Sequence, residues 1–147
     1  DLAPPGGLWC EFGVRQGRSL RWLIEHSPDQ VIHAFDSWQG LPEDWNHGTG
    51  KVADMSCDPP EVPAHIQLHQ GWFADTVPLW KQCNTGPISF LHMDADIYSS
   101  TITVLSELNE QKRRIAVGNS FATVESKKTL SLQKFGLFMK FWNANQV

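Results

Sequence analysis

Apolar runs that end at glycine or aspartate recur along the chain and predict the strands of a sheet. A short apolar run bounded by turn residues is typical of a buried strand. Such runs occupy residues 8–13, 31–35, 65–69 and 87–93. Helical spacing of apolar residues between and after these runs predicts helices over residues 17–26, 73–83 and 99–108. We expect Ser19 to cap the first helix. In the last helix we expect Ile102, Leu105 and Leu108 to face the core.

This alternation of strands and helices predicts an α/β fold, in which a Rossmann-like and mostly parallel sheet is flanked by helices. We expect a single domain over residues 1–147. Residues 37–63 are rich in Pro, Gly and Asp and show no periodicity, so they predict a long loop. A loop of that length in a compact domain is usually functional or mobile. Ligands of such sheets lie beyond the carboxyl ends of the strands.

Composition and charge exclude several classes of function. With 12 Lys and Arg residues against 16 Asp and Glu, the net charge is −4, and no basic run favours a nucleic-acid partner. No apolar stretch is long enough to cross a membrane, and the N-terminus has no signal-peptide pattern. The three cysteines form no close pair, which predicts a reducing, cytoplasmic location. Because the chain lacks an initiator Met, we expect an excised or incomplete chain.

A glycine turn follows the first expected strand and precedes a helix. Glu11 stands two residues before Gly13, and Gly17 closes the turn. The first N–H groups of a helix favour an anionic group of a ligand. Arg15 and Arg18 stand where the dinucleotide fingerprint requires glycine, which argues against NAD or FAD. An acid before the first glycine suits a ligand that carries an ammonium group.

Further acids and an aromatic residue follow the other strands. Asp36 can accept the hydroxyls of a ribose, although a surface turn would also place an aspartate there. Trp72 can stack on adenine or cap the core. Asp94 and Asp96 would repel each other unless a divalent cation or a raised pKa compensates. Because two acids exceed what capping the next helix needs, they predict a catalytic role.

Two motifs and two shorter segments lie at these strand ends. The motifs are Phe-Asp-Ser-x-x-Gly-Leu-Pro-Glu at residues 35–43 and Leu-His-x-Asp-x-Asp-x-Tyr-Ser-Ser-Thr at residues 91–101. The segments are residues 9–19 and 71–78. Together they resemble the macrocin O-methyltransferase family, whose class I enzymes use S-adenosylmethionine to methylate hydroxyls of sugars and natural products. The resemblance covers residues 8–118 in order and at similar spacing.

The resemblance implies which residues hold S-adenosylmethionine. Its methionine part would be surrounded by Glu11, Gly13 and Gly17. The residues near its carboxylate, at the start of the first helix, would be Arg18 and Ser19. Its ribose would be held by Asp36, with Ser37 beside it. Its adenine would be bordered by Gly71, Trp72 and Asp75.

The resemblance also implies how the methyl group is transferred. Asp94 would bind a divalent cation, Mg²⁺, and Asp96 would be the general base or a second metal ligand. Residues 41–63 would form a lid over the cofactor and a small hydroxylated acceptor. This reaction needs alignment of donor and oxygen and removal of the hydroxyl proton.

The resemblance ends at residue 118, and residues 119–147 diverge. In the family the next strand is apolar and ends in two acids that complete the metal site. Here residues 118–125 are polar, and Val124 occupies the position of the first acid. Only Glu125 remains as a candidate metal ligand. The aromatic residues that follow predict an open edge that either pairs with another chain, as in a homo-oligomer, or aggregates. A truncated chain with an incomplete sheet edge, a divergent family member and an altered reading frame all fit this pattern.

The sequence therefore favours an S-adenosylmethionine-dependent O-methyltransferase assisted by a divalent cation. Two alternatives stay open. One is a cofactor-binding remnant or an oligomerising interaction module, which the missing acid at Val124 favours. The other is a metal-dependent hydrolase that uses Asp94 and Asp96 and leaves Glu11 and Asp36 without a role.

Overall fold

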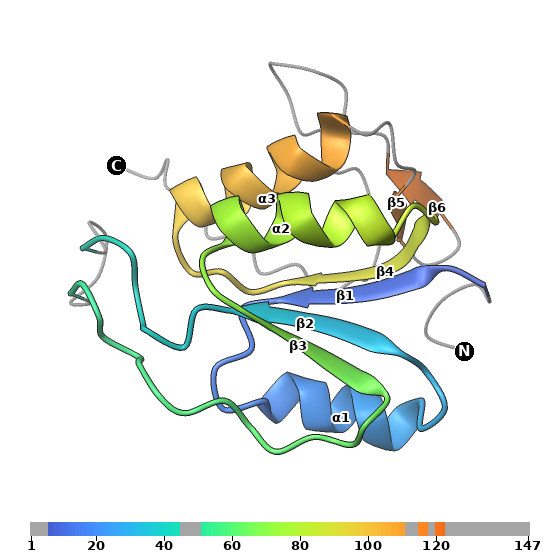
Figure 1. Cartoon of the computed structure of the whole chain (residues 1–147), viewed down its shortest axis with the longest axis horizontal. Coiled ribbons are helices and arrows are strands. Elements are labelled where there is room, and N and C mark those ends of the chain that lie inside the picture. Colours follow the sequence, from blue (N-terminus) through green and yellow to red (C-terminus); the bar gives the residue numbers. More distant parts are fainter. Residues whose placement is uncertain (1–5, 45–50, 111–114, 118–119, 123–147) are drawn as a thin grey trace.

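The computed structural model describes residues 6–44, 51–110, 115–117 and 120–122 (Figure 1). Strands and helices alternate as the apolar pattern predicts. The first half contains β1 (Leu8–Phe12), α1 (Arg18–His26), β2 (Ile32–Asp36) and β3 (Ile66–Gln70). The second half contains α2 (Phe73–Cys83), β4 (Ile88–Met93), α3 (Tyr98–Glu110), β5 (Ile115–Val117) and β6 (Ser120–Ala122).

One sheet joins all of these strands in the order β3-β2-β1-β4-β5-β6. The pairs from β3 to β5 are parallel, and β6 runs antiparallel to β5. The expected Rossmann-like, mostly parallel α/β fold is therefore confirmed. The polar segment after residue 118 contributes β6 as a short antiparallel strand beside β5 rather than as a central one. The expectations for Val124, Glu125 and the aromatic C-terminal segment fall outside the described residues.

The sheet lies between two layers of helices, with α1 on one face and α2 and α3 on the other (Figure 1). On the α1 face, Leu20 and Leu23 pack with strand residues that include Trp9, Ile32 and Ala34. On the opposite face, α2 and α3 pack on Cys10, Phe12 and Phe35 through Val77, Trp80, Val104 and Leu108. Because both faces are covered, β1, β2 and β4 are buried along most of their length, whereas β3 at the end of the sheet is only partly buried.

Two details of the helices differ from the expectation. Gly17, with a φ of 74°, occupies the N-cap position of α1. Ser19 lies inside the helix, and its hydroxyl donates a hydrogen bond to Glu11 instead of capping. Ile102 is 37% exposed rather than buried. At about 100° per residue, it lies well away from the stripe that α3 buries, which contains Val104, Leu105 and Leu108.

A pair of histidines joins β2 to β3 under α2. His33 is buried, and its Nδ1 lies 3.1 Å from Nε2 of His69. The His33 ring also packs edge-on against Trp80. Burial, together with the charge of His69, lowers the pKa of His33 from 6.5 to about 4. Burial likewise lowers the pKa of His69.

These pKa values predict that the fold loses stability in mild acid. Between pH 6.5 and about pH 4, His33 is protonated in the unfolded chain but neutral in the folded protein. The free energy of unfolding therefore rises with pH in this window. We expect the free energy of unfolding to be about 1–2 kcal/mol lower at about pH 5 than at about pH 7.5 on account of His33. Urea unfolding at both pH values measures this difference. The difference should shrink in His33→Gln, and an unchanged difference in that variant contradicts the assignment.

Candidate functional site

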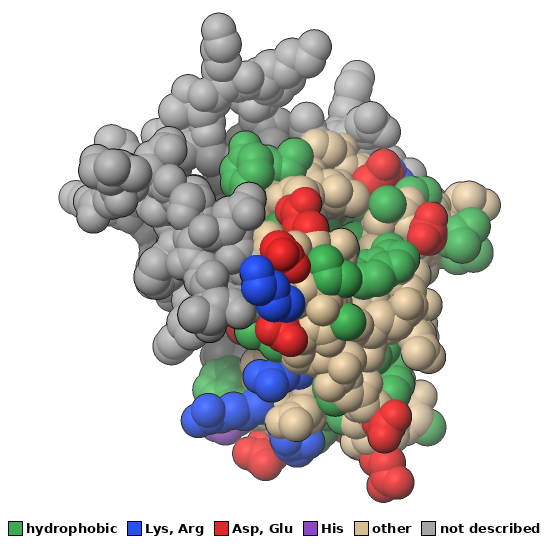
Figure 2. Space-filling view, turned by 90° about the vertical axis from the view of Figure 1, so that its left-hand side faces the viewer, with side chains coloured by type: hydrophobic (Ala, Val, Ile, Leu, Met, Phe, Trp, Pro, Cys, Tyr) green, Lys and Arg blue, Asp and Glu red, His purple; other side chains and the backbone are tan. Residues whose placement is uncertain are grey.

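The carboxyl ends of the strands are tied together by backbone hydrogen bonds. The Asp94 N–H donates to the Phe12 carbonyl at 2.8 Å, and the Gly13 N–H donates to the Phe35 carbonyl at 3.0 Å. The Gly71 N–H donates to the Asp36 carbonyl at 3.0 Å. The residues that follow β1, β2, β3 and β4 therefore lie along one edge of the sheet, on the left of Figure 1. Figure 2 looks onto this side, where acidic and basic side chains lie next to one another.

Gly13 makes the closest approach at this edge. Its φ is 87°, a value that L-residues with a side chain rarely adopt. A Cβ atom at this position would lie 2.1 Å from the carbonyl oxygen of Asp94. Both observations require glycine, so the turn after β1 packs directly against the backbone that follows β4.

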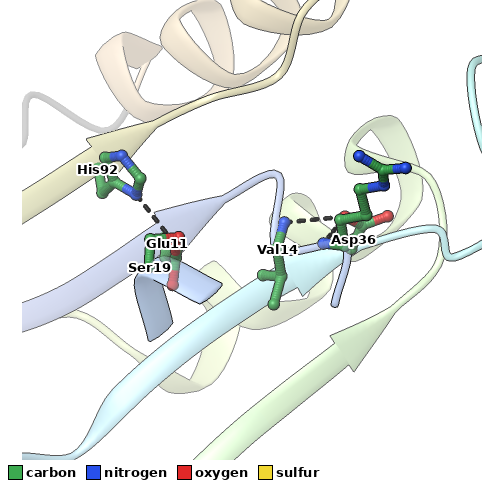
Figure 3. Close-up of polar contacts among 6 residues, drawn as sticks. Glu11, Val14, Ser19, Asp36 and His92 are labelled. Atoms are coloured by element: carbon green, nitrogen blue, oxygen red, sulfur yellow. Dashed lines mark hydrogen bonds and ion pairs between the residues drawn. The ribbon is translucent and has the colours of Figure 1, made fainter. Parts of the chain in front are cut away.

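Glu11 brings a carboxylate into the interior beside this turn. The residue is fully buried. Its Oε1 accepts a hydrogen bond from the Ser19 hydroxyl and lies 2.9 Å from Nδ1 of His92 (Figure 3). Its Oε2 is buried and has no hydrogen-bond partner among the described residues. Because a buried carboxylate oxygen without a donor is costly, this atom is an acceptor in need of a cationic or hydrogen-bonding partner.

His92 is the partner of Glu11 that the sequence did not reveal. Sequence reasoning treats it as a core histidine, whereas the structure sets it opposite Glu11 in the β1–β4 register. Burial lowers the pKa of His92, but the hydrogen bond and charge of Glu11, with the charge of Asp94, outweigh burial and raise it. Aligning the two expected strand ends, Gly13 with Asp94, is the signal that would have paired His92 with Glu11.

The Asp36 carboxylate binds the backbone of two segments. Its Oδ2 accepts hydrogen bonds from the N–H groups of Val14, at 2.8 Å, and Arg15, at 2.7 Å (Figure 3). Its Oδ1 accepts the N–H of Trp38 at 2.8 Å. Since a carboxylate offers about four acceptor positions, these bonds leave room for about one further donor.

The other residues expected at the cofactor lie around the same edge. Ser37 is buried and its hydroxyl accepts the N–H of Gln39. Arg18 is exposed at the start of α1. Gly71, whose φ is 139°, and Trp72 lead directly into α2, and Asp75 is exposed in the first turn of that helix.

Asp94 and Asp96 are both exposed, immediately after β4. Asp96 has a φ of 55°, which is uncommon for a residue other than glycine. The described residues contain no group of three or more His, Cys, Asp or Glu side chains that could hold a metal ion. Glu125, the expected second ligand, lies outside the described residues. The expected magnesium site, which includes Glu125, therefore stays a prediction.

The described parts of the expected lid touch both ends of the site. A Cβ atom on Gly17 would lie 3.0 Å from Cγ of Pro60, so the loop packs against the start of α1. At the other end, the Ser99 hydroxyl at the start of α3 donates a 2.6 Å hydrogen bond to Glu43. The loop between β2 and β3 thus contacts the residues before α1 and the start of α3.

Two expected absences concern the described residues as well. Cys10, Cys57 and Cys83 are free thiols in this structure. Among the helices that the structure describes, none has the length and apolarity needed to cross a membrane.

Comparison with known proteins connects this arrangement to a family. Two solved structures are similar at 22% identity: CalS11, a TDP-rhamnose 3′-O-methyltransferase of calicheamicin biosynthesis, and the O-methyltransferase NovP. CalS11 aligns with 73% of this chain at a TM-score of 0.49, and NovP with 72% at 0.46. The chain spans about half of each, 52%, and likeness this distant adds no weight to the assignment.

No curated protein gives a significant match to the sequence. A family model described as "Methyltransferase domain" matches residues 10–121, which is more than half of the chain. The matched residues contain β1 to β5 almost entirely, with the glycine turn and every acid named above except Glu125. The chain therefore belongs to the methyltransferase-domain family.

Proposed function

We propose that the chain is an S-adenosylmethionine-dependent O-methyltransferase that methylates a hydroxyl of a small molecule, such as a sugar or a natural product. The membership of the methyltransferase-domain family supports the reaction type. The resemblance to the macrocin O-methyltransferases supports the hydroxyl acceptor. The observation that carries the proposal is the buried Glu11 carboxylate, whose Oε2 lacks a donor among the described residues, beside the glycine turn.

The chemistry of the site fits the methionine end of S-adenosylmethionine. Glu11 Oε2 would accept the ammonium group, because it is a buried anion in need of a donor. The first N–H groups of α1 would face the carboxylate, as helix N-termini favour anions. Gly13 and Gly17 would let the backbone of the turn approach the methionine part. Arg18 and Ser19, at the start of α1, would lie near its carboxylate.

The nucleoside end would lie further along the same edge. Asp36 retains acceptor capacity for about one ribose hydroxyl, rather than the two that its position in the sequence allows. Ser37 would lie beside the ribose. Gly71, which is hydrogen-bonded to the Asp36 carbonyl, would border adenine together with Trp72 and Asp75.

When bound, the cofactor supplies a methyl group on a positively charged sulfur. The chain must align the acceptor oxygen with that methyl group and remove the hydroxyl proton. Asp96 would take the proton, because its carboxylate is exposed at the same edge. That Asp94 and Glu125 bind Mg²⁺ stays a prediction from the sequence, and the proton transfer to Asp96 does not require it. The single domain, the oligomer and the cytoplasmic location also stay predictions.

Titration with S-adenosylhomocysteine tests the cofactor, and Asp96→Asn tests the base. We expect saturable calorimetric binding by the wild-type chain. Asp96→Asn should bind within about twofold of wild type, while methyl transfer to a mixture of sugar nucleotides and glycosides falls by about 10²–10⁴-fold. Asp29→Asn, a change of an exposed aspartate beyond the end of α1, should leave transfer unchanged. Folded protein that does not bind the ligand refutes the function, and full transfer by Asp96→Asn refutes the base.

A further inference from the structure

Trp38 is a buried tryptophan at the beginning of the long loop, with an unusual backbone. It is 5% exposed and has a φ of 54°. Its indole Nε1–H donates a 2.8 Å hydrogen bond to the carbonyl of Arg15 in the glycine turn. Its ring packs in the cluster that contains Val14 and Leu20. A residue of the loop after β2 therefore holds the turn after β1.

Asp36, the last residue of β2, holds the same turn through its carboxylate. The carboxylate accepts the N–H groups of Val14 and Arg15, and it also accepts the N–H of Trp38. Both polar groups of the Arg15 backbone thus have partners from the loop side, Asp36 for the N–H and Trp38 for the carbonyl. Hydrogen bonds therefore join Asp36, Arg15 and Trp38 in a closed ring at the turn.

Arg15 needs this support because its own conformation is unfavourable. Its φ is 51°, and its side chain is exposed, so the side chain does not anchor the turn in the core. Non-glycine residues persist in this region of φ when their surroundings hold them there. The hydrogen bonds from Asp36 and Trp38 are that restraint.

The turn connects the two groups that would hold the amino-acid part of the cofactor. Glu11 lies before it, and the start of α1 lies after it. The Gly17 N–H donates to the Val14 carbonyl at 2.8 Å, so the position of Val14 fixes the residue that caps α1. Any shift at Val14 and Arg15 would move the helix start relative to the Glu11 carboxylate.

We propose that Trp38, through its indole hydrogen bond to the Arg15 carbonyl, is a positioning residue that sets the affinity for the amino-acid end of the cofactor. Trp38 is buried, and it would act through the turn. This inference rests on the proposed function, since it assumes that the turn binds the methionine part. It differs from a ribose contact, which would affect the nucleoside end of the cofactor.

Two ligands separate these effects. S-adenosylhomocysteine and 5′-methylthioadenosine share the adenosine and the thioether, but only the first carries the amino acid. Trp38→Phe keeps an aromatic ring and removes the indole donor. We expect this variant to lose about 3–10-fold in affinity for S-adenosylhomocysteine, as for one lost hydrogen bond. Its affinity for 5′-methylthioadenosine should change less than about twofold, because this ligand lacks the amino-acid end that the turn would contact.

Trp9→Phe is the matched control, because Trp9 is equally buried in the same cluster, where its ring stacks on Phe90. We expect it to leave the ratio of the two affinities at the wild-type value even where it lowers the melting temperature. A ratio that is also unchanged in Trp38→Phe overturns the inference.

If Trp38→Phe does not fold, Trp38→Met provides the same comparison, because it also fills an apolar site and removes the indole N–H. A selective loss for S-adenosylhomocysteine supports the inference, and equal losses for both ligands overturn it. Wild-type protein that binds neither ligand instead refutes the proposed function.

Discussion

Replacing Gly13 with alanine is expected to lower the free energy of unfolding by about 3–5 kcal/mol, the range of severe single substitutions. The added Cβ would lie 2.1 Å from the carbonyl oxygen and 2.7 Å from the carbonyl carbon of Asp94. Both atoms belong to the backbone, so relief requires β1 and β4 to separate at their carboxyl ends. The positive φ adds a second cost for any residue with a side chain. Urea unfolding measures the loss.

Gly6→Ala separates these two costs. Gly6 has nearly the same φ, 84°, but a Cβ atom there would meet no atom of the described residues within 4 Å. We expect it to lose only about 1–2 kcal/mol, the cost of the left-handed backbone. Equal losses in the two variants would mean that the turn does not pack on the backbone after β4.

Glu11→Gln is expected to weaken S-adenosylhomocysteine binding by about 10–100-fold. The substitution keeps the size of the side chain and removes the charge, and hydrogen bonds to a charged group contribute about 1.5–3 kcal/mol. Stability should change by less than about 1 kcal/mol, because the amide oxygen can still accept the hydrogen bonds of Ser19 and His92, and burying a neutral amide costs less than burying a carboxylate. Calorimetric titration and urea unfolding on the same protein measure both quantities.

A loss of affinity without a matching loss of stability distinguishes a binding role from a structural one. Glu25→Gln, at an exposed position of α1, should change neither quantity. Wild-type affinity in Glu11→Gln would show that the carboxylate does not meet the cofactor. A large loss of stability together with affinity would show that Glu11 holds the fold instead.

Local patterns in the sequence are sufficient for the order of the elements and the edge where the site lies. The apolar runs before Gly13, Asp36 and Asp94 become β1, β2 and β4, with bounds that differ by one residue at most at their ends. Parallel strands bring their carboxyl ends to the same edge, so the residues after them meet there. The described parts of the stretch between Asp36 and β3, residues 37–44 and 51–65, contain no helix or strand, as their composition predicts.

Contacts between distant residues could not be predicted in the same way. The pairing of Glu11 with His92 depends on the register of β1 and β4, which no single segment encodes. The indole of Trp38 reaches Arg15 because the loop backbone turns through a positive φ at Trp38 itself. Ile102 belongs to an apolar spacing, but the stripe that α3 buries runs through its neighbours.

Asp94 and Asp96 show where a sequence pattern is least informative. Two aspartates beside one alanine indicate concentrated negative charge, and the structure puts both at the surface after β4. A metal site requires a third ligand brought by another segment, and spacing within one motif cannot supply that information. Asp96 as the base therefore depends on the transfer assay, and Asp94 as a ligand depends on the segment that contains Glu125.

The most direct test of the central claim is a crystal structure of the chain with S-adenosylhomocysteine bound. The claim is that the buried Glu11 carboxylate receives the amino group of the cofactor at the carboxyl edge of the sheet. We expect the ligand's amino nitrogen to lie about 3 Å from Glu11 Oε2, at hydrogen-bond distance. A ligand bound elsewhere, or one whose amino group contacts another acceptor while a protein donor fills Oε2, would contradict it.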